Sequence, residues 1–408
     1  MHMQKTISFE NDVNNSSKWQ LLWPVLLTLI IPLIVAWFIY PSHLPPKFGE
    51  FPPQFVQAAP GFNLTYFLVM LASVIYIAGL ILFPQYYGFK GAPVIPREKS
   101  TVSLPWWFWA GGIVMGFFWW LMWSRVTPFG DLVLWAFTPL WWGFIFFLDG
   151  IVYQRNNGAS LFSQKPKTLF ICGVISILGW VYFEYYDYFV LGNWYYPNAD
   201  KVAWTKTTLT IEFLVTYSTV TPVLFQWFNL LNTFPKMLAR YQNGPKMVLN
   251  GNIMIIIGSA LIAAMTYWPY PLFWAVWIGP FAVMTGILMR LNIWNPFTDI
   301  AQGNWTAGIL IGVSSLLNGF FWEMWNYGSS HPSAEPITNP NYWIYNIPYV
   351  DVIHIFSEMP LLGYFGYIPF GVLVWQVFIW SGKFIGFDAN ILIKPIPVNL
   401  AHKESNES

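Results

Sequence analysis

The sequence has very little charge. Asp, Glu, Lys and Arg make up only 9% of its 408 residues, while hydrophobic residues make up 56% and aromatic residues 21%. A soluble domain carries about 25% charged residues, so this composition excludes an ordinary soluble protein. It predicts an integral membrane protein whose main partner is the lipid bilayer. The net charge of +1 excludes nucleic-acid binding as a main activity, because that activity needs a clear excess of Lys and Arg.

Cysteine is almost absent as well. The single cysteine, Cys172, lies in an apolar stretch, which excludes an intrachain disulfide and a Cys-based metal site. The sequence also has no dinucleotide-binding fingerprint, no P-loop, no Asp-rich diphosphate-binding motif and no HExxH motif. We therefore expect neither a cofactor nor a metal ion.

Long apolar segments are what the sequence has instead. Ten of them are about 20 residues long, the length that crosses a bilayer as a helix, so we expect an all-α polytopic membrane protein. They cover residues 19–40, 62–83, 104–126, 131–153, 168–190, 208–231, 248–268, 270–290, 305–327 and 351–380. Pro269 and Pro271 leave open whether the seventh and eighth segments are two helices or one broken element.

The positions of Lys and Arg predict the orientation of these segments. Fifteen of these residues fall on the side of the N-terminus, and only Lys47, Arg125, Lys201 and Lys206 fall on the other side. Cytoplasmic loops carry the excess of Lys and Arg, so we expect both termini in the cytoplasm and the protein in the cytoplasmic (inner) membrane. A cysteine introduced at Ser333 would then be labelled from outside, whereas one at Gly158 would not.

The sequence also predicts an internal duplication. A shift of 139 residues matches Trp135-Ala136 with Trp274-Ala275, Gly173 with Gly312, Ser176 with Ser315, Glu184 with Glu323 and Asp187 with Asn326. Each unit contains four segments, so the two copies run in the same direction, as in parallel-repeat membrane proteins. We expect an N-terminal tail and two extra helices over 1–100, the first repeat over 101–235, the second over 236–385, and a cytoplasmic tail over 386–408.

Four glutamates lie in or beside these apolar segments. Glu184 and Glu212 belong to the first repeat, and Glu323 and Glu358 to the second. A charged residue in a membrane helix costs roughly 2.5–3.5 kcal/mol even on a lenient scale, so these positions indicate a function. The expected topology places all four in the outer half of the membrane, where they can share one site as acid–base catalysts.

Aromatic and polar residues accompany the four acids. Asp187 and Tyr327 share a helix face with Glu184 and Glu323, and His354 would share one with Glu358. The loops that follow could close over the site. The candidate ligand-binding residues are Asp187, Trp194, Tyr196, Asn326, Tyr327, Trp343, Tyr345 and His354. A simpler interpretation makes the aromatic residues an interfacial belt, the acids solvated helix ends and His354 a hydrogen-bonded helix-end residue.

This pattern resembles the integral-membrane lycopene cyclases of the heterodimeric and fused type, whose two halves carry W-D, W-x-F/Y-N and P-x-E-E motifs. Trp325-Asn326, Trp343-Ile344-Tyr345-Asn346 and Ser357-Glu358-Met359-Pro360 stand in those places, as do Tyr186-Asp187, Trp194-Tyr195-Tyr196 and Ile211-Glu212-Phe213 in the first copy. The resemblance covers residues 168–231 and 305–380. It implies a cofactor-independent, acid-initiated reaction on a carotenoid or other isoprenoid, with the carboxylates as proton donor and acceptor.

Three classes of function remain open at this point. The first is an enzyme of the cyclase, isomerase or hydratase type that acts on an apolar isoprenoid- or lipid-like ligand. The second is a proton-coupled transporter or carrier, because parallel repeats with intramembrane acids also suit that class. The third is a membrane subunit without chemistry of its own, which would act with a membrane-protein partner that the sequence does not identify.

Overall fold

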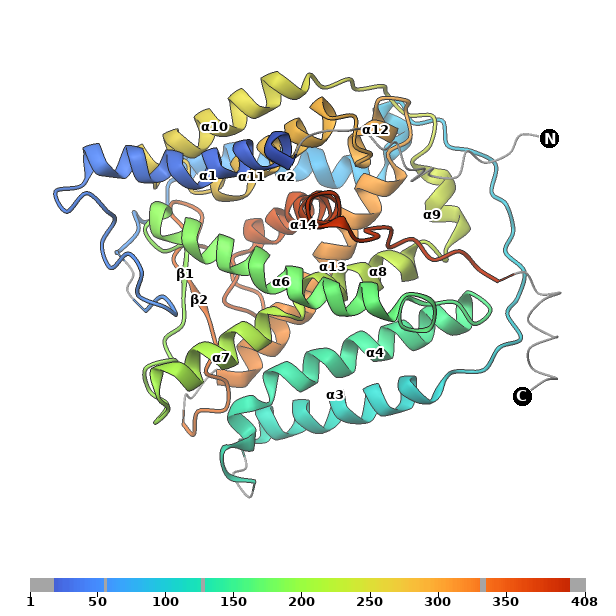
Figure 1. Ribbon diagram of the computed structural model, residues 1–408, viewed down its shortest axis with the longest axis horizontal. Coiled ribbons are helices and arrows are strands. Elements are labelled where there is room, and N and C mark those ends of the chain that lie inside the picture. Colours follow the sequence, from blue (N-terminus) through green and yellow to red (C-terminus); the bar gives the residue numbers. More distant parts are fainter. Residues whose placement is uncertain (1–17, 55–56, 126–128, 331–334, 397–408) are drawn as a thin grey trace.

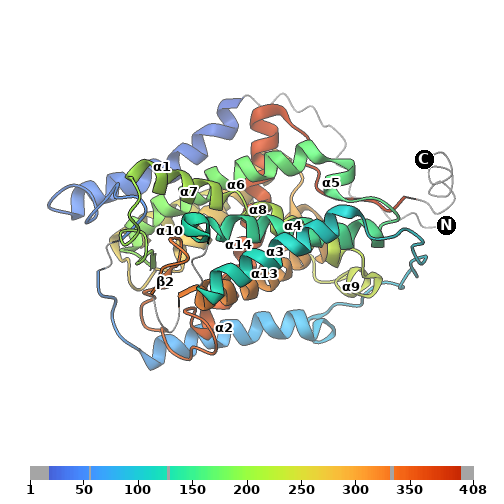
Figure 2. The ribbon, with the colours of Figure 1, turned by 90° about the horizontal axis from the view of Figure 1, so that it is seen from below.

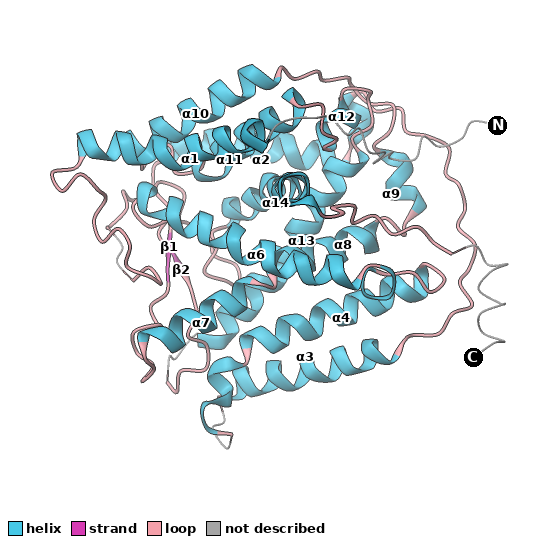
Figure 3. Ribbon diagram, in the orientation of Figure 1, coloured by secondary structure: helices cyan, strands magenta, loops and turns pink. Residues whose placement is uncertain are grey.

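The computed structural model describes residues 18–54, 57–125, 129–330 and 335–396. Ser333, the first 17 residues and the end of the expected C-terminal tail lie outside this part. The described chain is mostly helical, with one short pair of strands (Figures 1 and 3). The elements are α1 (Lys18–Ile39), α2 (Leu64–Leu82), α3 (Trp106–Ser124), α4 (Phe137–Arg155), α5 (Leu161–Gln164), α6 (Pro166–Asp187), β1 (Trp194–Tyr195), α7 (Lys206–Tyr217), α8 (Val220–Leu231), α9 (Pro235–Arg240), α10 (Gly251–Tyr267), α11 (Ala275–Arg290), α12 (Pro296–Ile300), α13 (Thr306–Ser330), β2 (Ile344–Tyr345) and α14 (Tyr367–Ser381).

Helical structure covers at least part of each predicted apolar segment, so the prediction of a helical protein is confirmed. Six of the described helical stretches are long and apolar enough to cross a membrane: Lys18–Ile39, Leu64–Leu82, Pro166–Val190, Lys206–Leu231, Thr306–Ser330 and Leu361–Gly386. These six are compatible with an integral membrane protein. The number of ten crossings stays a prediction.

The first two helices lie on different sides of the molecule. Figure 2 shows α1 along one edge of the helical bundle and α2 along the opposite edge. Helix α1 packs against α10 and α11, whereas α2 packs against the 3₁₀ turn Leu361–Gly366 that precedes α14. The N-terminal helices therefore flank the bundle separately.

Two helical hairpins are held together by glycine. Helix α3 packs along α4, and α10 packs along α11, so the seventh and eighth predicted segments are separate helices. A Cβ atom built on Gly111 would lie 2.6 Å from the carbonyl oxygen of Gly143, and one built on Gly258 would lie 2.6 Å from that of Gly279. Only glycine allows backbones to approach this closely, which is how helices pack tightly in a membrane.

The sixth predicted segment is broken in the middle. Helix α7 ends at Tyr217 and α8 begins at Val220, with Pro222 in its first turn, where proline is tolerated. The hydroxyl of Ser176 donates to the carbonyl oxygen of Tyr217 at 2.5 Å and accepts the N–H of Thr221 at 3.0 Å. A side chain of α6 thus bonds backbone groups beside the break, as a membrane interior requires.

The last predicted segment, 351–380, begins too early. Residues 351–360 are irregular, a 3₁₀ turn covers Leu361–Gly366, and α14 begins only at Tyr367. The backbone of Ile353 has φ 63°, which a right-handed helix does not allow, and Pro360 restricts the residue before it. The prediction that His354 and Glu358 share a helix face is therefore wrong.

Strands β1 and β2 join the two halves of the chain. They pair in antiparallel fashion, with Trp194 opposite Tyr345 and Tyr195 opposite Ile344. The sequence matches Trp194-Tyr195-Tyr196 with Trp343-Ile344-Tyr345, so Tyr195 and Ile344 are equivalent positions that face each other. This short ribbon lies at the end of the bundle where α6 and α13 finish (Figure 1).

Candidate functional site

Glu184 is the centre of a buried hydrogen-bonded group. It lies in α6, is 2% exposed, and its Oε1 accepts four hydrogen bonds. The donors are the Tyr196 hydroxyl at 2.5 Å, the Tyr217 hydroxyl and Trp180 Nε1 at 2.9 Å each, and Trp194 Nε1 at 3.4 Å. Trp180 is one helical turn before Glu184, and the break after Tyr217 ends α7 beside the acid. We call Glu184, Tyr196 and Tyr217 the first cluster.

Glu323 has the same kind of surroundings in the second half. It lies in α13 and is fully buried. Its Oε1 accepts from the Tyr367 hydroxyl at 2.6 Å and the Tyr345 hydroxyl at 2.7 Å, and Trp343 Nε1 donates to the Tyr345 oxygen at 2.9 Å. We call Glu323, Tyr345 and Tyr367 the second cluster. Each cluster thus combines a helix glutamate, a loop tyrosine and a tyrosine from an interrupted span.

Glu212 and Glu358 occupy unlike positions, although the sequence pairs them. Glu212 lies in α7, is fully buried, and accepts from Thr216 Oγ1 at 3.1 Å and from Asn341 Nδ2 at 2.5 Å. Asn341 comes from the loop of the other half. Glu358 lies in the irregular segment before α14, is only half-buried, and accepts from the Tyr342 hydroxyl. The structure therefore brings Glu212 into the protein core and leaves Glu358 at its edge.

One cavity joins the surroundings of Glu184, Glu323 and Glu212. It encloses about 830 Å³ of space free of atoms, including the open space at its mouth. We call it the acid cavity. Its wall consists of Phe137, Trp180, Trp194, Tyr196, Thr216, Tyr217, Thr219, Val220, Trp277, Trp322, Asn341, Trp343, Tyr345, Met359, Gly363, Gly366, Tyr367 and Phe370.

The glutamates themselves lie behind this wall. All four donors to Glu184, both tyrosine donors to Glu323 and both donors to Glu212 line the cavity. The second carboxyl oxygen, Oε2, of each of these three acids is buried without a hydrogen-bond partner. Buried polar atoms normally have partners, so three unpaired oxygens around one cavity mark it as a candidate site.

The two loop tyrosines remain neutral hydrogen-bond donors. Burial raises the pKa of the Tyr196 phenol well above its ordinary value, and the negative charge of Glu184 raises it further. Burial likewise raises the pKa of the Tyr345 phenol, and the negative charge of Glu323 raises it further. A phenol with a raised pKa keeps its proton at neutral pH. Each cluster therefore presents O–H groups between a carboxyl group and the cavity.

Other predicted site residues support the loops instead of lining the cavity. Asp187 Oδ1 accepts the backbone N–H of Asn193 at 2.7 Å. Asn326 accepts the N–H of Trp343 at 3.0 Å and donates to its carbonyl oxygen at 2.8 Å. Both residues thus position the strands that carry the cavity tryptophans.

His354 and Tyr327 are not part of the cavity wall. His354 is exposed and pairs with Asp351, with 3.1 Å between its Nε2 and the carboxylate. Burial raises the pKa of Asp351, and the charge of His354 opposes that shift. Tyr327 is half-buried in α13. The predicted ligand-binding residues that do line the cavity are Trp194, Tyr196, Trp343 and Tyr345.

Sequence reasoning missed several residues of the wall, namely Tyr217, Tyr367, Trp180, Thr216 and Asn341. A signal for the two tyrosines was present, because Tyr217 and Gln226 are separated by the same nine positions as Tyr367 and Gln376. Gln226 donates to Asp149 at 2.8 Å and Gln376 to Thr285 at 2.9 Å, so the two halves keep this contact as well.

Within the described residues, no group of three or more His, Cys, Asp and Glu side chains is arranged to hold a metal ion. No protein-family model matches the chain, and no curated protein sequence or solved structure matches it. The geometry of the acid cavity therefore carries the functional argument.

Proposed function

We propose that the chain consists of two repeated four-helix units preceded by two further helices, with ten membrane crossings in total and both termini in the cytoplasm. Corresponding contacts in the two halves support the duplication. They include the glycine contacts in the two hairpins, the two glutamate–tyrosine clusters, and the capping boxes at Ser160 before α5 and Asn295 before α12. In the antiparallel pair of β1 and β2, Tyr195 lies opposite Ile344, which is its equivalent in the second half. This arrangement is that of a local two-fold axis passing between the two residues. The fifteen-to-four distribution of Lys and Arg supports the orientation.

We further propose that the protein carries out cofactor-independent acid–base chemistry on an isoprenoid-like lipid in the acid cavity. The observation that carries this proposal is the presence of two similar glutamate–tyrosine clusters whose tyrosines line one largely aromatic cavity. One cluster can supply a proton and the other can accept one, which are the two steps that a double-bond isomerisation or a ring closure needs.

The reaction balances without a further reagent. A proton moves from the acid form of one glutamate through its hydrogen-bonded tyrosine to a carbon of a C=C bond, and the electron pair of that bond forms the new C–H bond. The resulting carbocation isomerises or is attacked by a second C=C bond of the same ligand. A proton is then lost from a neighbouring carbon to the other cluster, and its C–H electron pair forms the new C=C bond. No atom is oxidised or reduced overall.

The cavity wall suits a cationic intermediate. Trp180, Trp194, Trp277, Trp322 and Trp343 all line it, and the faces of tryptophan rings attract cations. Trp194 and Trp277 stack with their ring centroids 5.6 Å apart. An apolar ligand would also be well shielded from water among these rings.

The resemblance to the integral-membrane lycopene cyclases points to the same chemistry. Of the residues that carry it, Trp194, Tyr196, Trp343 and Tyr345 line the cavity, and Glu212 lies directly behind Thr216 and Asn341. We therefore propose a carotenoid or a similar polyene as the ligand and lycopene as the first probe.

Deuterium incorporation tests the proposal. The purified protein in lipid nanodiscs is incubated with lycopene in D₂O, and the polyene is extracted and analysed by mass spectrometry. We expect deuterium at carbon, because the proton that enters the double bond comes from groups that exchange with solvent. Glu184→Gln and Glu323→Gln should each abolish the incorporation. Glu50→Gln is the matched control, since Glu50 is a partly exposed acid paired with Lys47.

Other results would contradict the proposal. If deuterium is still incorporated in both glutamine variants, the two clusters do not take part in the reaction. If deuterium is absent but the protein moves the polyene or another solute with a pH gradient, the carrier interpretation holds. If neither occurs and only binding to other membrane proteins is found, the chain is a non-catalytic subunit.

A further inference from the structure

A second cavity continues from the acid cavity toward the other end of the bundle. It encloses about 1170 Å³ of space free of atoms, including its mouth. Helices α1, α6, α8, α11 and α14 and the turn after α14 contribute to its wall. We call it the tail chamber. Trp180, Val220 and Phe370 belong to the walls of both cavities, so the two spaces adjoin at these residues.

The tail chamber is suited to hydrocarbon. Its polar groups are few, and those near it bond within the protein: the hydroxyl of Thr28 donates to the carbonyl oxygen of Val25 at 2.7 Å, and that of Ser176 donates to the carbonyl oxygen of Tyr217. Tyr182, whose hydroxyl bonds Thr28, also lines it, and within the described residues no Asp, Glu, Lys, Arg or His side chain does. A chain that enters this space from the acid cavity therefore meets mostly apolar surface.

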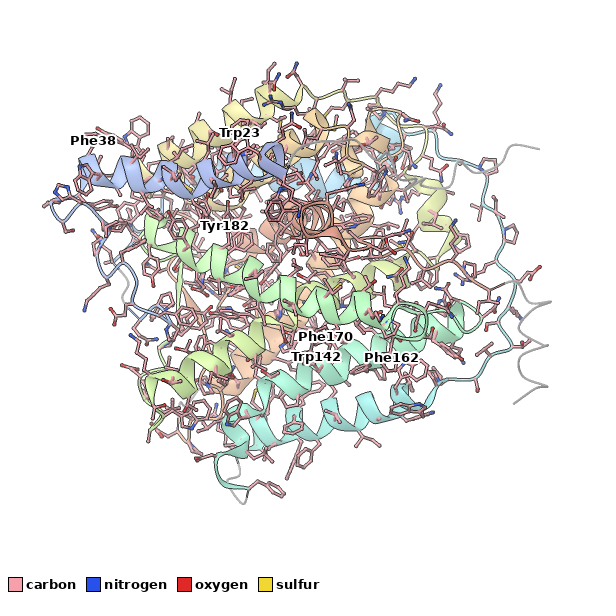
Figure 4. All side chains as sticks on the ribbon, viewed as in Figure 1. Trp23, Phe38, Trp142, Phe162, Phe170 and Tyr182 are labelled. Atoms are coloured by element: carbon pink, nitrogen blue, oxygen red, sulfur yellow. The ribbon has the colours of Figure 1, made fainter. Side chains whose placement is uncertain are left out.

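The chamber is elongated. Along α14 and the turn after it, the wall extends from Phe370 to Ile385, which corresponds to about 22 Å at the rise of a helix. Leu178 and Ile385, both in its wall, are 61% and 59% exposed, so it opens at the outer surface of the bundle. Figure 4 shows Tyr182 between α6 and α1 on this side, where its hydroxyl bonds Thr28.

The chamber exists because the two halves differ. Helix α8 packs closely along α13, whereas the equivalent pair, α14 and α6, lies farther apart. A strictly symmetric molecule would close both crevices in the same way. The crevice between α6 and α14 adjoins the acid cavity at Trp180 and Phe370.

We propose that the ligand is a long-chain isoprenoid lipid that occupies both cavities, with its reacting end in the acid cavity and its hydrocarbon tail in the tail chamber. The assignment of the reacting end rests on the proposed function, but the occupancy of the tail chamber is testable separately. A ligand of this kind gains burial with every carbon added to its tail.

Two glycines allow each cavity to be filled selectively. A Cβ atom built on Gly179, in the wall of the tail chamber, meets no heavy atom within 4 Å, and the same is true of Gly366 in the wall of the acid cavity. Gly366 has φ −61°, which any L residue can adopt. Gly116 on the exposed surface of α3 also has open space and serves as the matched control.

The experiment measures the affinity of nanodisc-embedded protein for acyclic polyenes of ten, twenty and forty carbons that share the same end group. For the wild type we expect affinity to rise with length. Gly179→Leu should weaken the forty-carbon polyene about tenfold, equivalent to the loss of about two buried methylene groups, and should leave the ten-carbon polyene unchanged. Gly366→Leu should weaken all three, and Gly116→Leu none.

A second measurement does not depend on the folding of a variant. A forty-carbon polyene with a diazirine at its tail end is photolysed on the wild-type protein, and the modified peptides are mapped. Cross-links on α6 near Gly179 and on α14 beyond Phe370 are expected. Cross-links confined to the acid cavity, or equal affinity of the wild type and Gly179→Leu for the longest polyene, would overturn the proposal.

The two proposals fail in different ways. If deuterium is incorporated but Gly179→Leu has no effect, the proposed chemistry is supported and the proposed position of the tail is wrong. If Gly179→Leu has a length-dependent effect but no deuterium is incorporated, the proposed ligand site is supported and the proposed chemistry is wrong.

Discussion

Replacing the two cluster glutamates by leucine should destabilise the protein to different extents. In Glu184→Leu, four donors lose their shared acceptor: two tyrosine hydroxyls and two indole N–H groups. Trp180 Nε1 also donates to the Tyr196 oxygen at 3.4 Å, so three donors are left without a partner. A buried donor without a partner costs about 1–3 kcal/mol, so the sum is about 3–9 kcal/mol. That range is comparable with the whole stability of a typical protein. In Glu323→Leu the two tyrosine hydroxyls are left unpaired, and the same reasoning gives about 2–6 kcal/mol.

The glutamine variants should behave differently. The amide oxygen of Glu184→Gln can accept the same four hydrogen bonds, and its NH₂ group takes the place of Oε2, which has no partner in any case. We expect a cost of about 1–3 kcal/mol, well below that of leucine. The assay is the fraction of detergent-purified protein that stays monodisperse after heating, measured for all four variants and for Glu50→Leu as the surface control. The reasoning is refuted if Glu184→Leu is as heat-stable as the wild type or more stable than Glu323→Leu.

Three further predictions follow from other parts of the molecule. The proposed topology places the exposed residue Ser42 outside the cell and the exposed residue Lys246 inside it. In a Cys172→Ala background, a cysteine at position 42 should therefore react with a membrane-impermeant thiol reagent in intact cells, and one at position 246 should not. The reverse pattern would invert the topology. Gly258→Val should lower stability by about 1–3 kcal/mol through overpacking, because its Cβ would lie 2.6 Å from the Gly279 oxygen. The control is Gly116→Val, which meets open space. Equal heat stability of the two variants would contradict this prediction. Burial raises the pKa of Asp351, so the folded state holds that proton more tightly than the unfolded state, and Asp351 lowers stability as the pH rises above its ordinary pKa. In thermal unfolding, Asp351→Asn should remove this decline and His354→Asn should steepen it. Identical profiles for the two variants would show that the pair does not contribute.

The sequence predicted the helices well because lipid leaves the backbone few alternatives. A long apolar run must satisfy its own hydrogen bonds and does so as a helix, which is why α1, α2, α6 and α13 agree with the expected segments within a few residues. The prediction failed where apolar sequence does not form a regular helix. Residues 351–366 are rich in apolar residues, but Ile353 has a left-handed backbone and a 3₁₀ turn begins at Leu361.

The site was predicted in part. Glu184 and Glu323 stood out because a constant shift of 139 residues relates them within apolar sequence. Tyr217 and Tyr367 did not stand out, because the longer loop of the second half changes the shift to 150 at that point. A shift of 147, which also matches Pro222 with Pro369, pairs Tyr217 with Tyr364 instead. In the structure Tyr364 bonds Ser357 at 2.8 Å, whereas Tyr367 bonds Glu323. A single offset cannot follow a duplication through loops of unequal length.

The cavities themselves depend on the difference between the halves, which no repeat pattern reveals. In the first half, α7 is a regular helix that carries Glu212 into the core, where Asn341 of the second half bonds it. In the second half the corresponding residues 351–360 are irregular, and Glu358 stays at the edge. Helix α14 therefore begins without a helical segment such as α7 in front of it, and it lies farther from α6 than α8 lies from α13. In the function that we propose, duplication supplies two similar proton-exchanging clusters, and the difference between the halves beside α14 supplies the space for the tail of a long ligand.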